Sequence, residues 1–219
     1  MKKMKIKHAI NWHKFLTFLI ILGLMAFYNN FTPLAWIYLA LHGTYGLMWL
    51  IKDRLYPDQQ WEKEIPLAMG IFTFIVLGLY WAAPFIIVSG KVTAAAPLIS
   101  AAIAINIMGV FLHYGSDAQK YFTLKYREGL ITEGFFSRSR NPNYLGEILI
   151  YLSFALLAQH WLPFLILGGF IAGVFIPNML KKDRSLSRYP EFDAYKAKSG
   201  LLLPKLINSR LDARQSTQT

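Results

Sequence analysis

The sequence predicts an all-α membrane protein, a polytopic bundle of about six transmembrane helices with both termini in the cytoplasm. Three observations predict this class. The 219 residues are 55% hydrophobic and only 16% charged, whereas soluble domains carry about 25% charged residues. The apolar residues gather in long blocks without Asp, Glu, Lys or Arg, and the basic residues alternate between the ends of those blocks.

The charge-free blocks set the expected helices. A spanning helix needs about 20 apolar residues, so blocks 15–51 and 148–180 are each long enough for two. Asn29-Asn30 breaks the first block and Pro163 the second. The expected spans are 11–30, 33–51, 65–88, 93–113, 144–159 and 162–180.

The distribution of positive charge predicts the orientation. Of the 23 Lys and Arg, all but Lys91 fall on one side of these spans, which the positive-inside rule makes cytoplasmic. The net charge of +11 is then a topology signal facing anionic lipid, and we expect no nucleic-acid partner. We expect a multi-pass protein of a bacterial inner membrane, or of the endoplasmic reticulum in a eukaryote. The sequence indicates no oligomeric state.

Composition along the chain predicts three regions. Residues 1–113 form an N-terminal four-helix membrane region. Residues 114–207 form a core with the last two transmembrane helices, and end in an interfacial amphipathic segment whose Leu-Leu-Leu-Pro patch docks on the bundle. Residues 208–219 are polar and predicted to be disordered.

Polar residues recur along one face of the fourth expected span. Asn106, His113, Asp117 and Lys120 are seven, four and three residues apart, so they share a helical stripe. A helix end that becomes wet explains Lys120 but not Asn106, because polar groups are costly beside lipid. We therefore favour a functional stripe. His42 in the second span is a similar case, since a titratable ring within a span usually faces a cavity or a partner.

The densest polar cluster is the stretch GLITEGFFSRSRNPNYLGE, residues 129–147. Gly129 is expected to end the preceding helix, and Pro142 to begin the next. Helix capping accounts for Asn141 and Glu147. It does not account for the gathering of Arg138, Arg140, Asn143 and Tyr144 in the same short stretch.

Familiar catalytic motifs are absent from the sequence. There is no GxGxxG, GxxxxGK[ST], HExxH or GxSxG, and the five His lack metal-ligand spacing. The chain has no Cys, which excludes thiol chemistry and disulfides. What is left is a cytoplasm-facing polar pocket whose Arg and Lys suit phosphate or carboxylate groups.

Residues 116–151 resemble a known cofactor-binding core. The segment SDAQKYFTLKYREGLITEGFFSRSRNPNYLGEILIY is similar to the core of membrane steroid 5-alpha-reductases, sterol C14 reductases and their bacterial relatives. The similarity extends over about residues 105–207 and includes Tyr189-Pro190 and a closing Pro204. The resemblance implies NADPH bound in the cytoplasmic half of the bundle. It also implies hydride transfer to a polarised carbon-carbon double bond of a steroid- or isoprenoid-like lipid.

The resemblance also implies which residues act. The cofactor-binding candidates are Asn106, His113, Asp117, Lys120, Arg127, Arg138, Arg140, Asn143, Tyr144 and Tyr195. Reduction of an enone needs an acid that polarises the carbonyl and a proton donor. The chemical candidates for those roles are His42, Tyr45, Tyr114 and Glu147.

Two alternatives are kept. Isoprenylcysteine carboxyl methyltransferases belong to the same superfamily, share the layout and use S-adenosylmethionine. Asn143 before Leu-Gly-Glu is more like the reductases, and Lys181-Lys182-Asp183 replaces the paired Glu of the methyltransferases. The N-terminal Gln-Glu element of the steroid reductases is absent, which bears on the substrate. The second alternative is a non-catalytic membrane scaffold that binds anionic lipid and no nucleotide.

Overall fold

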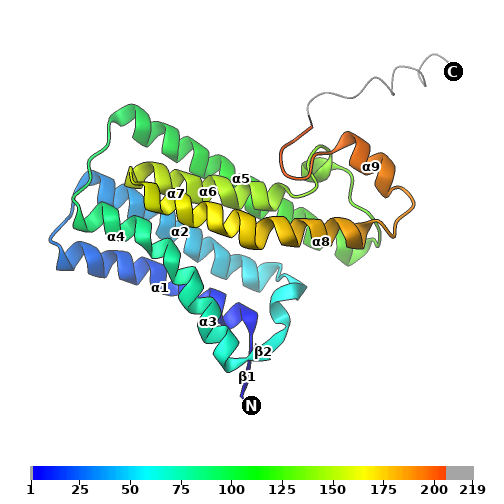
Figure 1. Cartoon of the computed structure of the whole chain (residues 1–219), viewed down its shortest axis with the longest axis horizontal. Helices are drawn as coiled ribbons and strands as arrows, with labels where there is room; N and C mark the ends of the chain where they lie inside the picture. The colour runs from blue at the N-terminus through cyan, green and yellow to red at the C-terminus, as the bar shows by residue number, and fades with distance from the viewer. Residues whose placement is uncertain (1, 206–219) are drawn as a thin grey trace.

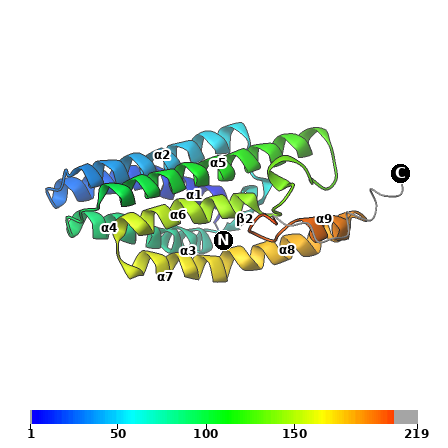
Figure 2. The ribbon, with the colours of Figure 1, turned by 90° about the horizontal axis from the view of Figure 1, so that it is seen from above.

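The computed structural model describes residues 2–205 and shows a bundle whose helices run back and forth between two ends (Figures 1 and 2). Helix α1 (Ile6–Phe27) reverses into α2 (Pro33–Leu55) through Asn29, whose φ of 46° makes the tight turn. Helix α3 (Leu67–Leu77), a 3₁₀ turn (Gly78–Trp81) and α4 (Ala82–Ser89) follow each other without a gap.

The second half of the chain supplies the remaining helices. Helix α5 (Ala96–Tyr126) is followed by a short 3₁₀ turn (Gly134–Phe136) and α6 (Pro142–Ala158). Helix α7 (Trp161–Phe170) continues through a π-helical stretch (Ile171–Phe175) into α8 (Ile176–Leu186). The last described helix is the short α9 (Phe192–Lys198), beside the end of α8 (Figure 1).

Five of these helices are long and apolar enough to cross a membrane: α1, α2, α3 with α4, α5, and α7 with α8. Helix α6 is apolar but shorter, at 17 residues. The expected helical, multi-pass membrane architecture is therefore confirmed. The sixth crossing, the side of the termini and the orientation stay predictions.

Helix α5 continues beyond the expected span 93–113 to Tyr126 and carries its polar stripe out of the apolar part, as the stripe to Lys120 and the expected helix end at Gly129 predicted. The structure differs from the expected elements in two places. The third span is interrupted by a 3₁₀ turn just before Pro84, where the ring removes a backbone donor. An all-α chain was expected, yet strands β1 (Lys3–Lys5) and β2 (Glu64–Pro66) pair antiparallel. Three-residue strands are too short to show an alternating pattern.

Helices α5 and α6 pack with their backbones in close contact. A Cβ on Gly109 would lie 2.7 Å from the Gly146 carbonyl oxygen and 2.8 Å from the Ile150 nitrogen. A Cβ on Gly146 would meet the His113 nitrogen. Small residues at such crossings let membrane helices approach without a layer of side chains. The contact fixes the polar stripe of α5 against the start of α6.

The segment before α6 is joined to the end of the described chain. Ser139 and Gly200 form a parallel bridge, with Arg140 N donating to Gly200 O (2.9 Å) and Gly200 N to Arg138 O (2.9 Å). Leu201 and Leu202 pack against the core, as expected for the Leu-rich patch. The predicted disordered tail, 208–219, lies outside the described residues.

Candidate functional site

Three neighbouring hollows lie at the end of the bundle where α2 and α5 finish and α6 begins. The deep pocket has a volume of about 120 Å³. The vestibule, with about 390 Å³, shares Asn143, Tyr144 and Asn178 with it. The side pocket, with about 430 Å³, borders the deep pocket at Asp117 and the vestibule at Lys120. Because they share lining residues, the three hollows lie side by side.

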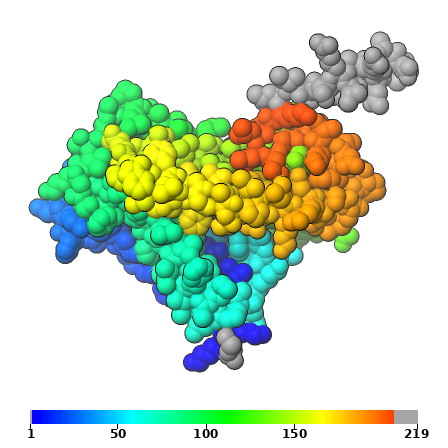
Figure 3. Space-filling view, viewed as in Figure 1, coloured from blue at the N-terminus to red at the C-terminus, as the bar shows by residue number. Residues whose placement is uncertain are grey.

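The deep pocket is polar on one wall and apolar on the other. Its polar wall includes Lys14, His113, Asn143 and Glu147. The apolar wall comes from the α3 region and from α7 with the π-helical stretch, and consists of Leu77, Tyr80, Phe170, Val174 and Phe175. Figure 3 shows the surface hollowed between α3 and the α7–α8 band. A ligand with a polar head and an apolar body fits such a pocket.

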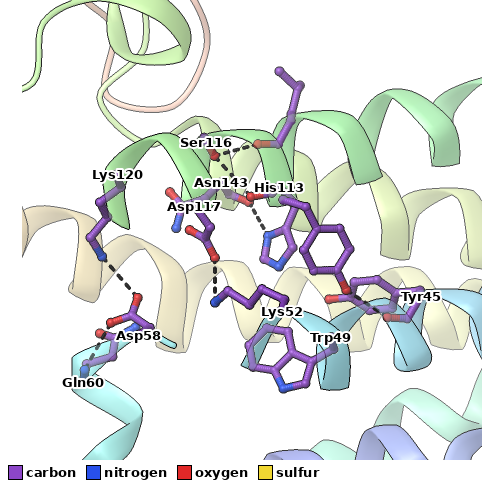
Figure 4. A network of polar contacts seen from close by, with 12 residues as sticks. Tyr45, Trp49, Lys52, Asp58, Gln60, His113, Ser116, Asp117, Lys120 and Asn143 are labelled. Carbon is purple, nitrogen blue, oxygen red and sulfur yellow. Dashed lines mark hydrogen bonds and ion pairs between the residues drawn. The ribbon is translucent and has the colours of Figure 1, made fainter. Parts of the chain in front are cut away.

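The polar stripe of α5 supplies one wall of the site (Figure 4). His113 Nδ1 pairs with the Asn143 carbonyl oxygen at 3.0 Å. Asp117 forms an ion pair with Lys52 at 3.0 Å. Further along the helix, Lys120 forms an ion pair of 3.1 Å with Asp58.

Asn106 is separated from the rest of the stripe. Its amide donates to Ser153 Oγ at 2.9 Å between α5 and α6, and the residue lines none of the three hollows. A helix–helix hydrogen bond therefore explains this polar residue within the apolar section. The cofactor contact predicted for it has no support in the geometry.

Several buried polar atoms around the deep pocket lack partners. Within residues 2–205, His113 Nε2, Asp117 Oδ1 and Asn143 Oδ1 are buried and make no hydrogen bond. Nearly all buried polar atoms in native proteins have a partner. All three residues line the deep pocket, so a bound molecule with donors and acceptors would satisfy them.

The vestibule is strongly cationic. Asp58 is its single acidic lining residue in the described chain. The basic lining residues are Lys63, Lys120, Arg140, Lys181 and Lys182. Such a surplus of donors and positive charge suits phosphate groups.

Arg140 holds the wall of the vestibule together. Its Nε donates to both carboxylate oxygens of Asp183 at 3.0 and 3.1 Å, and its NH1 donates to the Ser199 carbonyl at 2.5 Å. Tyr195 donates to the Phe136 carbonyl at 2.7 Å, and burial raises the pKa of Tyr195 to about 12. Both predicted residues line the vestibule, yet their polar groups already bind protein acceptors.

The other predicted residues lie elsewhere. Arg127 forms an exposed ion pair with Glu133, and Arg138 is exposed; neither lines a hollow. His42 Nδ1 pairs with Tyr38 OH at 3.0 Å inside the core. Tyr114 donates to the Tyr45 carbonyl at 2.8 Å. Of the four acid candidates, only Glu147 lines the deep pocket.

Two buried lysines of the site were not among the predicted residues. Lys14 on α1 lines the deep pocket, and Lys52 on α2 pairs with Asp117. The sequence analysis counted both as cytoplasmic topology signals. Their positions directly beside the charge-free block 15–51 were the available signal, because an ionisable residue within a spanning helix indicates a functional site.

The fold and the site define a multi-pass helical membrane protein with a cation-lined internal site. Residues 36–199 match the family described as "Protein of unknown function (DUF1295)", and the chain belongs to that family.

Two relatives come from Schizosaccharomyces pombe. The chain is 34% identical over 113 residues to the uncharacterized protein C594.04c of that organism, and the matched segment covers 46% of this chain and 32% of the relative. It is 49% identical over 39 residues to the uncharacterized protein C7D4.09c, covering 18% of this chain and 14% of the relative. The matched parts thus span less than half the length of either relative.

Proposed function

We propose that the protein is an integral-membrane, NADPH-dependent reductase of a carbon-carbon double bond in a lipophilic substrate, related to membrane steroid 5-alpha-reductases. The observation that carries the proposal is the cationic vestibule beside a deep pocket with one polar wall and a larger apolar wall. A polyanionic nucleotide and an apolar substrate can meet in such a site.

The residues present fit NADPH. The cofactor carries a diphosphate and a ribose phosphate, and the vestibule offers Lys63 and Lys181, together with Lys120, which is paired with Asp58, and Lys182, which also donates to the Arg140 carbonyl oxygen at 2.7 Å. The unpartnered Asn143 Oδ1 lies where the vestibule meets the deep pocket and would accept a donor from the cofactor. S-adenosylmethionine carries a sulfonium cation and a single carboxylate, so it makes less use of four lysines.

The site divides the chemistry between its two walls. Bound NADPH would supply a hydride to the electron-poor carbon of a polarised double bond. Glu147 lines the deep pocket, and its carboxylate would take up a proton from water and pass it to the neighbouring carbon, so that two electrons and two hydrogens are added in total. Tyr80, Phe170 and Val174 would keep water away and hold the apolar part of the substrate.

The proposal places six crossings in the bilayer, with the site end and both termini in the cytoplasm. Helix α6, with 17 residues, measures about 25 Å at about 1.5 Å per residue, slightly less than the hydrocarbon core. It packs along α5, so much of its surface contacts that helix and not lipid. The chain turns alternate between the two ends of the bundle, as successive crossings require (Figure 1).

Thermal shift of the detergent-purified protein with NADPH, NADH and S-adenosylmethionine tests the proposal. We expect stabilisation by NADPH. Stabilisation by S-adenosylmethionine alone would indicate the methyltransferase. No response to any of the three, in protein extracted with native lipid, would indicate the scaffold.

Two variants locate the cofactor. Asn143→Ala should lose NADPH stabilisation while the helical circular dichroism is unchanged. Lys181→Met should weaken NADPH binding about three- to fivefold, the value of one exposed ionic contact. Lys198→Met is the matched control, because Lys198 is exposed at the same end and lines no hollow. Equal effects of the two lysine variants would refute the assignment of the vestibule.

A further inference from the structure

Lys14 is a buried cation at the inner end of the deep pocket. The residue is only 3% exposed. Its Nζ donates to Tyr151 OH at 2.9 Å and lies 4.0 Å above the centre of the Tyr45 ring. Helices α1 and α2 meet closely here, since a Cβ on Gly46 would lie 2.6 Å from the Lys14 carbonyl oxygen. The fold therefore fixes the ammonium group in place.

Lys14 has no carboxylate in ion-pair contact among the residues that the structure describes. Lys52, equally buried, has one, because Asp117 lies 3.0 Å away. The charge of Glu147 acts on Lys14 without direct contact, and both residues line the deep pocket. The rings of Tyr45, Trp49 and Tyr151, whose centres lie 4.0, 5.5 and 5.4 Å from the Lys14 Nζ, compensate part of the cost of a buried cation. The remaining cost indicates that the Lys14 ammonium group binds a further hydrogen-bond acceptor, supplied by a ligand.

We propose that Lys14 binds the carbonyl oxygen of the substrate, and that the substrate is a flexible-chain lipid with a conjugated ketone at its head. A pocket of about 120 Å³ is smaller than the 300 Å³ or more of sites that enclose whole ligands, so it takes a head group only. The chain would leave along Leu77 and Val174, between α3 and the π-helical stretch.

A neutral ketone suits the pocket better than a carboxylate. Glu147 shares the pocket with Lys14, and a second anion there would be repelled by it. A ketone oxygen is neutral when it binds. When the far carbon of the conjugated double bond accepts a hydride, the π electrons of that bond shift toward the carbonyl, and the oxygen becomes the negative oxygen of an enolate. The Lys14 ammonium would stabilise that charge, after which the proton reaches the neighbouring carbon. The reaction rests on the proposed function, whereas ketone binding is a separate claim.

Binding of three probes to the purified full chain tests the inference. The probes are pentadecenone (a straight-chain enone), pentadecene (the same chain without oxygen) and pentadecanoic acid. Their binding is followed by tryptophan fluorescence, because Trp49 lines the pocket. One hydrogen bond from a charged donor contributes about 1.5–3 kcal/mol, so the wild type should bind pentadecenone at least about tenfold more tightly than pentadecene.

Lys14→Met keeps the apolar stem and removes the charge. We expect it to lose the preference for pentadecenone and to bind both chains equally, with NADPH affinity unchanged. Lys198→Met is the control and should keep the preference. If Lys14→Met does not fold, Lys14→Gln and Lys14→Arg replace it. The preference for pentadecenone over pentadecene should be reduced in Lys14→Gln and partly kept in Lys14→Arg.

Each outcome decides one claim. An unchanged preference in the Lys14 variants overturns the role of Lys14. Absence of pentadecenone binding to the wild type, or tighter binding of pentadecanoic acid, overturns the assigned ligand class. A Lys14-dependent preference in a protein that does not bind NADPH overturns the proposed reductase function and leaves the ketone site standing.

Discussion

The Lys52–Asp117 pair should be far more costly to break than an exposed ion pair of the same protein. The two charges lie 3.0 Å apart, with side chains 3% and 8% exposed. Asp117 Oδ1 makes no hydrogen bond in the described part of the chain. Lys52→Met therefore leaves a buried carboxylate without its direct partner, which costs about 3–5 kcal/mol. By contrast, Lys120 in its pair with Asp58 is 36% exposed, and that pair should contribute about 0–1 kcal/mol.

A double-mutant cycle measures this difference. Lys52→Met, Asp117→Asn and the double variant are unfolded reversibly in mixed micelles with increasing denaturing detergent, and helicity is followed by circular dichroism. We expect the double variant to be more stable than the sum of the single losses predicts, with a coupling energy of about 2 kcal/mol or more. The cycle Lys120→Met with Asp58→Asn is the control. Additive losses at Lys52 and Asp117, or a coupling no larger than in the control cycle, would refute the reasoning.

Two further predictions concern stability. Gly109→Val should lower the melting temperature by several degrees and loosen the α5–α6 contact, because its Cβ would lie 2.7 Å from a backbone oxygen. The control Gly168→Val, whose Cβ would have nothing within 4 Å, should leave the melting temperature unchanged. Equal shifts in the two variants would contradict the packing argument. Hydrogen bonds from Lys5 and then Lys7 lower the pKa of Glu62 from 4.5 to about 2. The pKa of Glu62 is lower in the folded state than in the unfolded state, so this stabilisation is present above pH 4.5 and is lost as the pH falls to about 2. The difference in melting temperature between wild type and Glu62→Gln should therefore shrink over that range. A constant difference would show that the ion pairs of Glu62 with Lys5 and Lys7 do not stabilise the fold.

The helices could be predicted because lipid imposes a simple rule on the sequence. Charge-free blocks and the breaks at Asn29 and Pro163 indicated where helices begin and end. The β1–β2 pair could not be predicted, because three-residue strands are defined by backbone partners far apart in the chain. The extension of α5 beyond its apolar part could be predicted, because the helical stripe reaches Lys120 and Gly129 indicates a helix end close to the observed Tyr126.

Site residues could be predicted where a polar side chain occurs within a largely apolar segment or in a dense polar cluster. They could not be predicted where a lysine flanks a span, because such lysines normally mark topology. His113 and Asp117 were chosen because their polar stripe continues from apolar sequence, and Asn143 because it lies in the polar stretch 129–147; all three line the deep pocket. Lys14 was missed because lysines that flank a span normally mark topology. Tyr114 was chosen for its chemistry, but its hydroxyl binds the Tyr45 carbonyl, a contact between distant helices that no local pattern reveals.

The bridge between Ser139 and Gly200 has a consequence for the biogenesis of the protein. Arg140 is synthesised before its two partners, Asp183 and Ser199, leave the ribosome. The first five helices can therefore insert while the wall of the vestibule is still incomplete. A chain that stops before residue 183 would keep those helices but lack Asp183 and Ser199, so the wall of the vestibule is completed only late in translation.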